Sequence, residues 1–289
     1  MPSNTAPGSS RIPKRSPAAK RAPSPHPTAR STTTHATKPA PSAVAIEPIG
    51  DAPAAPPRRR HRFSFTVLKT TMAVTGTALA LFVAVHMFGN LKAFAGPQAY
   101  NAYAVWLREA LHPLLPVEGL LWLMRLVLGT CLLLHVAAGV TLWLRGRAAR
   151  GTHRRQGMRL HAVATGSMLL TGALIGFFVL VHLLDLTIGA LVAPSAYTPP
   201  AHTGGTLQIS AYQNLVASLS RPGMAMFYTA VMLGLSLHLS QGLWNVVIDL
   251  GGTGLRLRQV FLVVAHVAAL LVVLINGALP LLVLTGVIA

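Results

Sequence analysis

The stretch TVLKTTMAVTGTALALFVAVHMFG, residues 66–89, is apolar along almost its whole length and contains one histidine, His86. Four more apolar stretches follow, at about residues 120–144, 161–188, 224–247 and 259–286. Each reaches the length of roughly 20 residues that a helix needs to cross about 30 Å of hydrocarbon. The sequence therefore predicts an all-α membrane protein, with a five-transmembrane-helix bundle in residues 63–289.

Composition supports the same class of protein. Of the 289 residues, 52% are hydrophobic and 10% are charged, and the mean hydropathy is +0.54. The net charge of +18 is high, but 11 of the 24 Lys and Arg residues lie in the first 62 positions and most others lie near span ends. This distribution is typical of membrane topology, so we expect no nucleic-acid partner. The single cysteine, Cys131, excludes an intrachain disulfide and a cysteine-ligated iron–sulfur cluster within this chain.

Residues 1–62 have a different composition, rich in Pro, Ala, Ser, Thr and Arg. Such a segment cannot bury enough apolar surface to offset the entropy lost on ordering. The sequence therefore predicts a disordered basic tail. A transit peptide has a similar composition, although we favour a cytoplasmic extension.

Basic residues indicate how the spans are oriented. They cluster before the first span and in the loops after the second and fourth spans: Arg58, Arg59, Arg60, Arg62, Lys69, Arg145, Arg147, Arg150, Arg154, Arg155, Arg159, Arg256 and Arg258. The loops after the first and third spans contain only Lys92, Arg108 and Arg221. The positive-inside rule then predicts a cytoplasmic N-terminus and a C-terminus outside.

The next three spans each contain one histidine in their interior, His135, His182 and His238. Counting about 1.5 Å per residue from the charged boundaries places His86 and His182 near the outer surface. The same count places His135 and His238 about 7–10 Å deeper, on the inner side. Haem iron bound by two imidazoles needs one ligand from each of two facing helices. The spacing therefore predicts two b haems, ligated by His86 with His182 and by His135 with His238. No repeat of 20–50 residues accompanies these histidines.

The neighbours of the histidines fit a porphyrin but also fit simple helix packing. Small residues stand four positions to either side of the inner histidines: Cys131, Gly139, Gly234 and Gly242. Such stripes leave room for a flat ring, and they equally allow close helix contact. Phe82 and Phe178, one turn before the outer histidines, line a haem or face lipid.

Three other polar residues lie in or beside the spans. Arg125 is five residues inside the second span, where it either extends outward to the interface or pairs with a haem propionate. His161 and His266 lie toward the cytoplasmic side. They either lie near a propionate or a quinone or are simply polar residues at the membrane interface, and we favour the second interpretation.

Two motifs carry a resemblance to a known family. The first is H-x-x-G-N-L at residues 86–91, and the second is N-x-Y-A-x-x-L-R at residues 101–108. With one histidine in each of the first four spans, residues 64–286 resemble the single-chain di-haem cytochrome b anchor of bacterial succinate dehydrogenases and fumarate reductases. The resemblance implies that the first and third spans ligate the haem far from the cytoplasmic subunits and the second and fourth ligate the near one.

The resemblance also implies partners and a location. These are a flavoprotein subunit, an iron–sulfur subunit, the lipid of the bacterial cytoplasmic membrane, and a quinone, usually menaquinone. The chain itself has no dinucleotide fingerprint and no cysteine cluster for dicarboxylate chemistry. Quinone reduction takes up protons and needs an acid–base group. In the family this carboxylate follows the first span, and Glu109 lies at about that position, with Glu118 and Asp185 as the other outer carboxylates.

Two other classes of protein stay open. Another transmembrane cytochrome b, of the hydrogenase type or like cytochrome b561, also uses paired histidines, although the H-x-x-G-N-L stretch and the five spans count against it. A histidine-lined metal or proton transporter is the second, but it is expected to carry more carboxylates or broken helices at mid-membrane.

Overall fold

In a computed structural model, the chain is described over residues 63–150, 159–203 and 206–289, without the side chains of residues 150, 159–165 and 203. The predicted disordered tail, residues 1–62, lies outside the described residues. The remainder of the chain forms one unit of packed helices, within Arg59–Ala289.

Among the described residues, five helical stretches are long and apolar enough to cross a membrane, which confirms the predicted number of helices of this length and composition. They are built from α1 (Phe65–Asn90), α3 (Gly119–Arg150), α4 (Arg159–His182), α6 (Pro222–Asp249) and α7 (Leu255–Leu271). Two of them contain a π-helical turn, in which backbone hydrogen bonds join residues five positions apart instead of four. η2 (Leu183–Ile188) continues α4, and η3 (Val272–Gly277) joins α7 to α8 (Ala278–Leu284).

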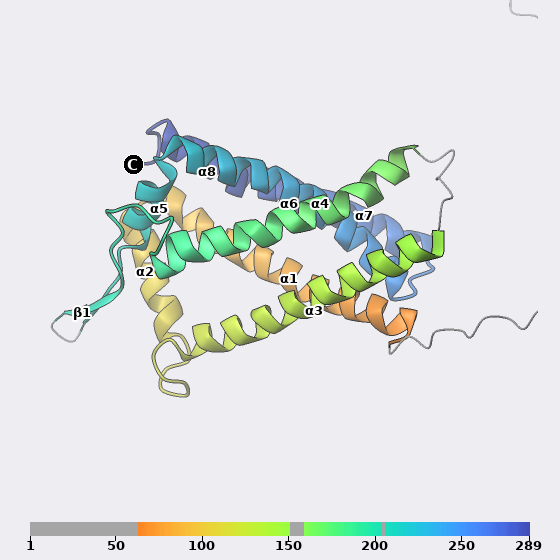
Figure 1. The fold of residues 1–289 in the computed structure, drawn as a ribbon. Coiled ribbons are helices and arrows are strands. Elements are labelled where there is room, and N and C mark those ends of the chain that lie inside the picture. The colour runs from red at the N-terminus through yellow and green to blue at the C-terminus, as the bar shows by residue number, and fades with distance from the viewer. Residues whose placement is uncertain (1–62, 151–158, 204–205) are drawn as a thin grey trace, which may run out of the picture. The chain divides into compact units, whose positions relative to one another are not determined.

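Shorter elements gather at one end of the bundle, as Figure 1 shows. They are η1 (Leu91–Ala95), α2 (Pro97–Glu109), α5 (Ala211–Leu219) and an antiparallel hairpin of β1 (Ala201–Thr203) and β2 (Thr206–Gln208). Gly96, with φ of 91°, makes the sharp corner between η1 and α2, where a residue with a side chain is strained. By the predicted topology, this end faces outward.

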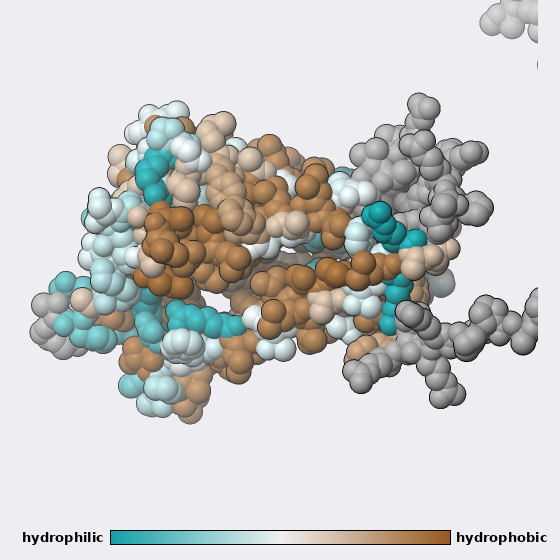
Figure 2. All heavy atoms as spheres, in the orientation of Figure 1, coloured by the Kyte–Doolittle hydropathy of each residue, from teal (hydrophilic) through white to brown (hydrophobic). Residues whose placement is uncertain are grey.

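The four helices that contain His86, His135, His182 and His238 form a ring that is open on one side. α1 packs against α3 and α6, and α6 packs against α4 and α7, whereas α3 has no extended packing with α4 or α6 in the described residues. Helices α1 and α4 likewise stand across the ring from each other without extended packing. Figure 2 shows the open side as a narrow gap between α3 and α4 on the face in view.

A buried core lies on the other side of the ring, between α6 and the last span. Val231, Met232 and Val272 are buried there, and Tyr212, Leu219 and Leu279 extend this core to the short helices of the outer end. At the opposite end, Lys69 Nζ is 2.7 Å from Asp249 Oδ1 and joins the start of α1 to the end of α6. α3 has no such core around it, so the ring stays open beside it.

Candidate functional site

The structure brings the four span histidines together in two pairs. The ring centroids of His86 on α1 and His182 on α4 are 5.8 Å apart, and those of His135 on α3 and His238 on α6 are 6.4 Å apart. Each pair joins two helices that stand across the ring from each other. These are the same two pairs that turn counting along the sequence predicted.

The ring spacings match two imidazoles on opposite sides of one metal ion. Metal–imidazole distances of about 2.0 Å and ring radii of about 1.1 Å put the two centroids about 6.3 Å apart. Among the described residues, no group of three or more His, Cys, Asp or Glu side chains is placed to hold a metal ion. A metal ion between the two rings of a pair would take its remaining ligands from another group.

Threonine hydroxyls fix the tautomers of the inner pair. Thr75 Oγ1 donates its proton to the carbonyl oxygen of Thr71 at 2.6 Å, so the contact of 3.2 Å with His135 requires His135 Nδ1–H to be the donor. Thr171 Oγ1 likewise donates to a carbonyl one turn earlier and lies 3.1 Å from His238 Nδ1. With Nδ1 protonated, each Nε2 carries the lone pair that a metal needs.

Glycines beside the threonines make room for the inner imidazoles. A Cβ on Gly76 would lie 3.0 Å from His135 Cε1, and one on Gly172 would lie 3.4 Å from His238 Cε1. α1 therefore receives the His135 ring on the face that Thr75 and Gly76 form, and α4 receives the His238 ring in the same way.

A short sequence repeat underlies this symmetry, and the sequence analysis missed it. TGTALALFVAVH at residues 75–86 and TGALIGFFVLVH at residues 171–182 lie 96 residues apart and share six of twelve positions. Each copy supplies the threonine and glycine for one inner histidine and, three turns later, one outer histidine. The sequence signal of this repeat is the spacing between Thr-Gly and His, which recurs in two spans.

Aromatic rings surround the outer pair. Phe82 stacks on His86 at 5.5 Å, and Phe178 stacks on His182 at 5.4 Å, so both phenylalanines line the site. Nδ1 of His182 is buried and has no hydrogen-bond partner among the described residues. The ring of Tyr228 lies 6.1 Å from that of His182. The outer imidazoles are therefore held mainly by apolar contacts.

Along α1, the inner and outer levels are separated by about three turns. His135 meets α1 at Thr75 and Gly76, about ten residues before His86, which corresponds to about 15 Å of helix. The expected separation of about 7–10 Å along the membrane normal was counted from charged residues and stays a prediction. α1 has 26 residues, which corresponds to a length of about 39 Å. Charges at its ends therefore lie outside a hydrocarbon core of about 30 Å and are poor markers of its boundaries.

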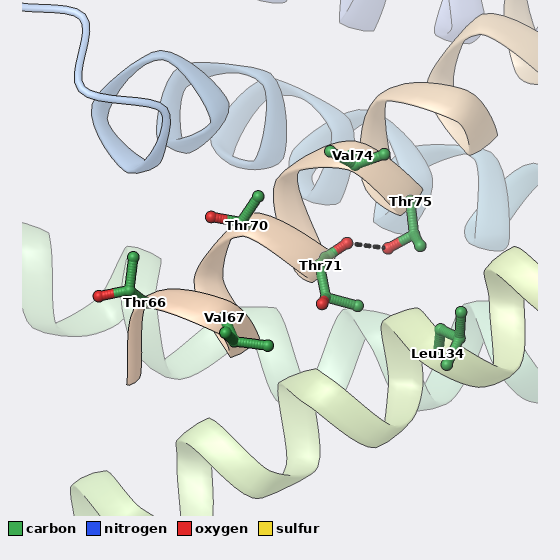
Figure 3. Close-up of a pocket in the computed structure, with 7 residues that line it drawn as sticks. All are labelled: Thr66, Val67, Thr70, Thr71, Val74, Thr75 and Leu134. Carbon is green, nitrogen blue, oxygen red and sulfur yellow. Dashed lines mark hydrogen bonds between the residues drawn. The ribbon is translucent and has the colours of Figure 1, made fainter. Parts of the chain in front are cut away.

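A groove of about 430 Å³ adjoins the inner pair. Its walls are α1 and α3, and its lining is Thr66, Val67, Thr70, Thr71, Val74, Thr75 and Leu134. In Figure 3 the Thr71 and Thr75 side chains lie on the part of α1 that faces α3, and the dashed line marks the Thr75 bond to Thr71. Since Thr75 also contacts His135, the groove extends from the inner pair toward the N-terminal end of α1.

The two family-like motifs build the outer end of the bundle. Gly89 of the first motif packs against Tyr103 of the second, because a Cβ on Gly89 would lie 2.8 Å from the Tyr103 ring. Asn90 Nδ2 donates to Asn276 Oδ1 at 3.1 Å across α1 and η3. Asn101 Oδ1 accepts from the backbone N–H of Tyr212 at 2.9 Å. Apart from His86, these motif residues therefore position helices.

The outer carboxylates have different surroundings. Glu109, at the end of α2, is exposed and has no side-chain partner in the described part of the chain. Glu118 Oε1 accepts from Arg108 Nε at 2.9 Å. Asp185 is fully buried and pairs with Arg221.

Burial and the neighbouring Tyr103 raise the pKa of Tyr100, in α2, to about 12, so its phenol stays protonated near neutral pH.

The remaining polar candidates lie apart from the pairs. Arg125 is exposed, with its guanidinium 4.7 Å from the Trp122 ring centroid, which fits outward extension at the interface. Its pairing with a propionate stays a prediction. His266 is exposed, with Nδ1 2.7 Å from the carbonyl oxygen of Leu262 in its own helix. The His161 side chain lies outside the described residues.

Comparisons of the chain with protein-family models, with curated proteins and with solved structures find no match. The described residues define a helical protein with five potential membrane spans and two histidine pairs, each formed between two helices.

Proposed function

We propose that this chain is the membrane-anchor cytochrome b subunit of a bacterial succinate:quinone oxidoreductase, with two bis-histidine b haems. The observation that carries the proposal is the presence of two histidine pairs, each across the ring and each with a centroid distance suited to one metal ion. A porphyrin supplies four nitrogen ligands of its own, so two protein ligands suffice.

The residues of the chain would share the work of binding. His86 and His182 hold the outer haem, with Phe82 and Phe178 against the imidazoles, and His135 and His238 hold the inner one. The gap between α3 and α4 and the groove beside Thr75 offer room for a flat group and its substituents. When bound, the two haems supply one-electron transfer between the two sides of the membrane.

Partners complete the proposed reaction. A flavoprotein and an iron–sulfur subunit on the cytoplasmic side exchange electrons with the inner site, and menaquinone exchanges them at the outer end. Glu109 is our choice for the proton donor and acceptor at the quinone. Its carboxylate is exposed at the outer end, whereas Glu118 and Asp185 are engaged in ion pairs.

The two rival classes make different predictions. A histidine-lined transporter needs no haem, although the π-helical turns η2 and η3 do interrupt two of the spans. Other transmembrane cytochromes b bind haem but have no flavin-bearing partner. Haem content and copurification of a flavoprotein therefore separate the three.

The test is a haem count on the purified chain and on two variants. The wild-type protein should contain two b haems per polypeptide, and His182→Leu should retain one, because one axial ligand of the outer haem is gone. His266→Leu is the matched control: this histidine also lies inside a span but is paired with no other histidine among the described side chains, so two haems should remain. A colourless wild-type protein, or two haems in His182→Leu, would refute the proposal.

A further inference from the structure

A buried ionic cluster lies directly after the outer histidine of α4. Asp185 is three residues beyond His182, in η2, and is 0% exposed. A buried carboxylate loses several kcal/mol of hydration free energy unless donors replace the water. Three side chains do so: Arg221 Nη2 donates to Oδ1 at 2.7 Å, Tyr228 Oη donates to Oδ2 at 3.0 Å, and Ser218 Oγ donates to Oδ2.

Arg221 is itself held by the backbone around it. Its Nη1 donates to the carbonyl oxygen of Val192 at 2.6 Å, and its Nε donates to the carbonyl oxygen of Ser218 at 3.1 Å. The cluster thus ties together the end of α4, the end of α5 and the start of α6. Because each member has several partners, the position of the Asp185 carboxylate is closely fixed.

Tyr228 transmits this fixed position to the outer histidine. Its hydroxyl is bound to Asp185, and its ring lies 6.1 Å from the His182 ring and 5.0 Å from the Phe178 ring. The Tyr228 side chain is buried, so its hydroxyl is held by Asp185 and its ring is held by the neighbouring rings. The Tyr228 ring therefore forms part of the wall beside the His182 ring, and its position depends on the bond to Asp185.

The inner and outer pairs are oriented by different means. At the inner pair, Thr75 and Thr171 accept hydrogen bonds from the imidazoles. At the outer pair, Nδ1 of His182 is buried without any partner in the described part of the chain, so no hydrogen bond orients its ring. We propose that Tyr228, held by the cluster of Asp185, Ser218 and Arg221, is the positioning residue of the outer ligand His182.

This inference rests on the proposed function, because it assigns Tyr228 a role at the outer haem. The orientation of an axial imidazole and the groups around it tune the spectrum and the reduction potential of the iron. A change at Tyr228 should therefore alter the outer haem and leave the inner one unchanged. A merely structural residue would loosen the whole bundle and affect both.

The experiment uses the intact complex in membranes and two readouts, the low-spin ferric EPR signals and a potentiometric titration of the haem bands. The His182→Leu variant identifies which signal belongs to the outer haem. Tyr228→Leu removes both ring and hydroxyl, Tyr228→Phe removes only the bond to Asp185, and Thr171→Val is the matched change at the inner pair.

Tyr228→Leu should change the ratio of reduced to oxidised outer haem at least tenfold at a fixed potential, which is about 59 mV for one electron. Tyr228→Phe should produce a smaller change at the outer haem, and Thr171→Val should move only the inner signal. If Tyr228→Leu does not assemble, Tyr228→Phe decides the matter, because it should still shift the outer haem more than the inner one.

Two results would overturn the inference: an outer signal that stays unchanged, or equal shifts of both haems. These outcomes presuppose two haem signals in the wild-type protein. Their absence there would instead refute the proposed function and, with it, the assignment of Tyr228.

Discussion

At the residue scale, the two inner histidines depend on hydroxyl groups that a sequence pattern does not mark as functional. Thr75 and Thr171 are buried and each completes two bonds, one to a carbonyl of its own helix and one to an imidazole. A buried imidazole N–H without an acceptor costs about 1–3 kcal/mol, so each hydroxyl stabilises one ring orientation and one tautomer. The threonine thereby leaves Nε2 free for the metal in the proposed site.

Replacement of Thr75 tests this role. Thr75→Val has almost the same shape but removes the Oγ1 acceptor of His135 Nδ1–H, so the inner haem should dissociate at a lower temperature than in the wild-type protein. Thr75→Ser keeps the hydroxyl and should restore the wild-type behaviour. The measurement is the thermal loss of the inner haem absorbance band in detergent, with the outer band as internal reference. A Val variant that retains its inner haem as well as the Ser variant would contradict the assigned hydrogen bond.

At the element scale, the helices with histidines must approach closely at some points and stay apart at others. α4 and α6 pack against each other, and Leu174 of α4 already lies 2.9 Å from a Cβ built on Gly234 of α6. Gly172, two residues before Leu174, leaves the space that the His238 ring enters. On α6, the small residue Gly234 therefore allows close packing against α4. The space beside the His238 imidazole comes from Gly172 on α4.

Filling that space should damage one site selectively. Gly172→Leu would push the His238 ring away from α4, so the inner haem should be lost and the outer haem kept. Gly166→Leu is the control on the same helix, because Gly166 is exposed and a Cβ there meets nothing within 4 Å. Both variants can be compared by haem content per polypeptide and by the EPR signal that remains. Equal haem contents in the two variants would show that Gly172 makes no special room.

The elements also show what local sequence can and cannot predict. Five apolar runs of sufficient length gave the spans, since each run is read from about 20 residues. The π-helical turns η2 and η3 were not predicted. Their residues make contacts such as Asp185 with Tyr228 and Asn276 with Asn90, which join segments far apart in the chain and which local sequence does not contain. The pairing of α1 with α4 and of α3 with α6 was predicted from histidine depth alone. The contributions of Thr75 and Thr171 escaped notice because a threonine in a span is usually bonded to its own backbone.

At the scale of the whole bundle, ion pairs sharpen the charge difference between the two ends. Two of the three basic residues in the outer loops are neutralised, Arg108 by Glu118 and Arg221 by Asp185. At the other end, Lys69 pairs with Asp249, while Arg145 and Arg258 donate to backbone carbonyls and keep their charges. The excess of positive charge at that end is the feature that the positive-inside rule reads as cytoplasmic.

The proposed orientation can be measured because the chain has one cysteine, Cys131, which is removable as Cys131→Ser. In that background, Ser195→Cys lies in an exposed position of the outer loop and Thr253→Cys in an exposed position between α6 and α7. A maleimide that cannot cross membranes should label the cysteine at 195 in intact cells, because the positive charges hold the other end in the cytoplasm. The cysteine at 253 should react only after the cells are opened. The reverse pattern would invert the topology and place the inner histidine pair, rather than the outer one, next to the external quinone site.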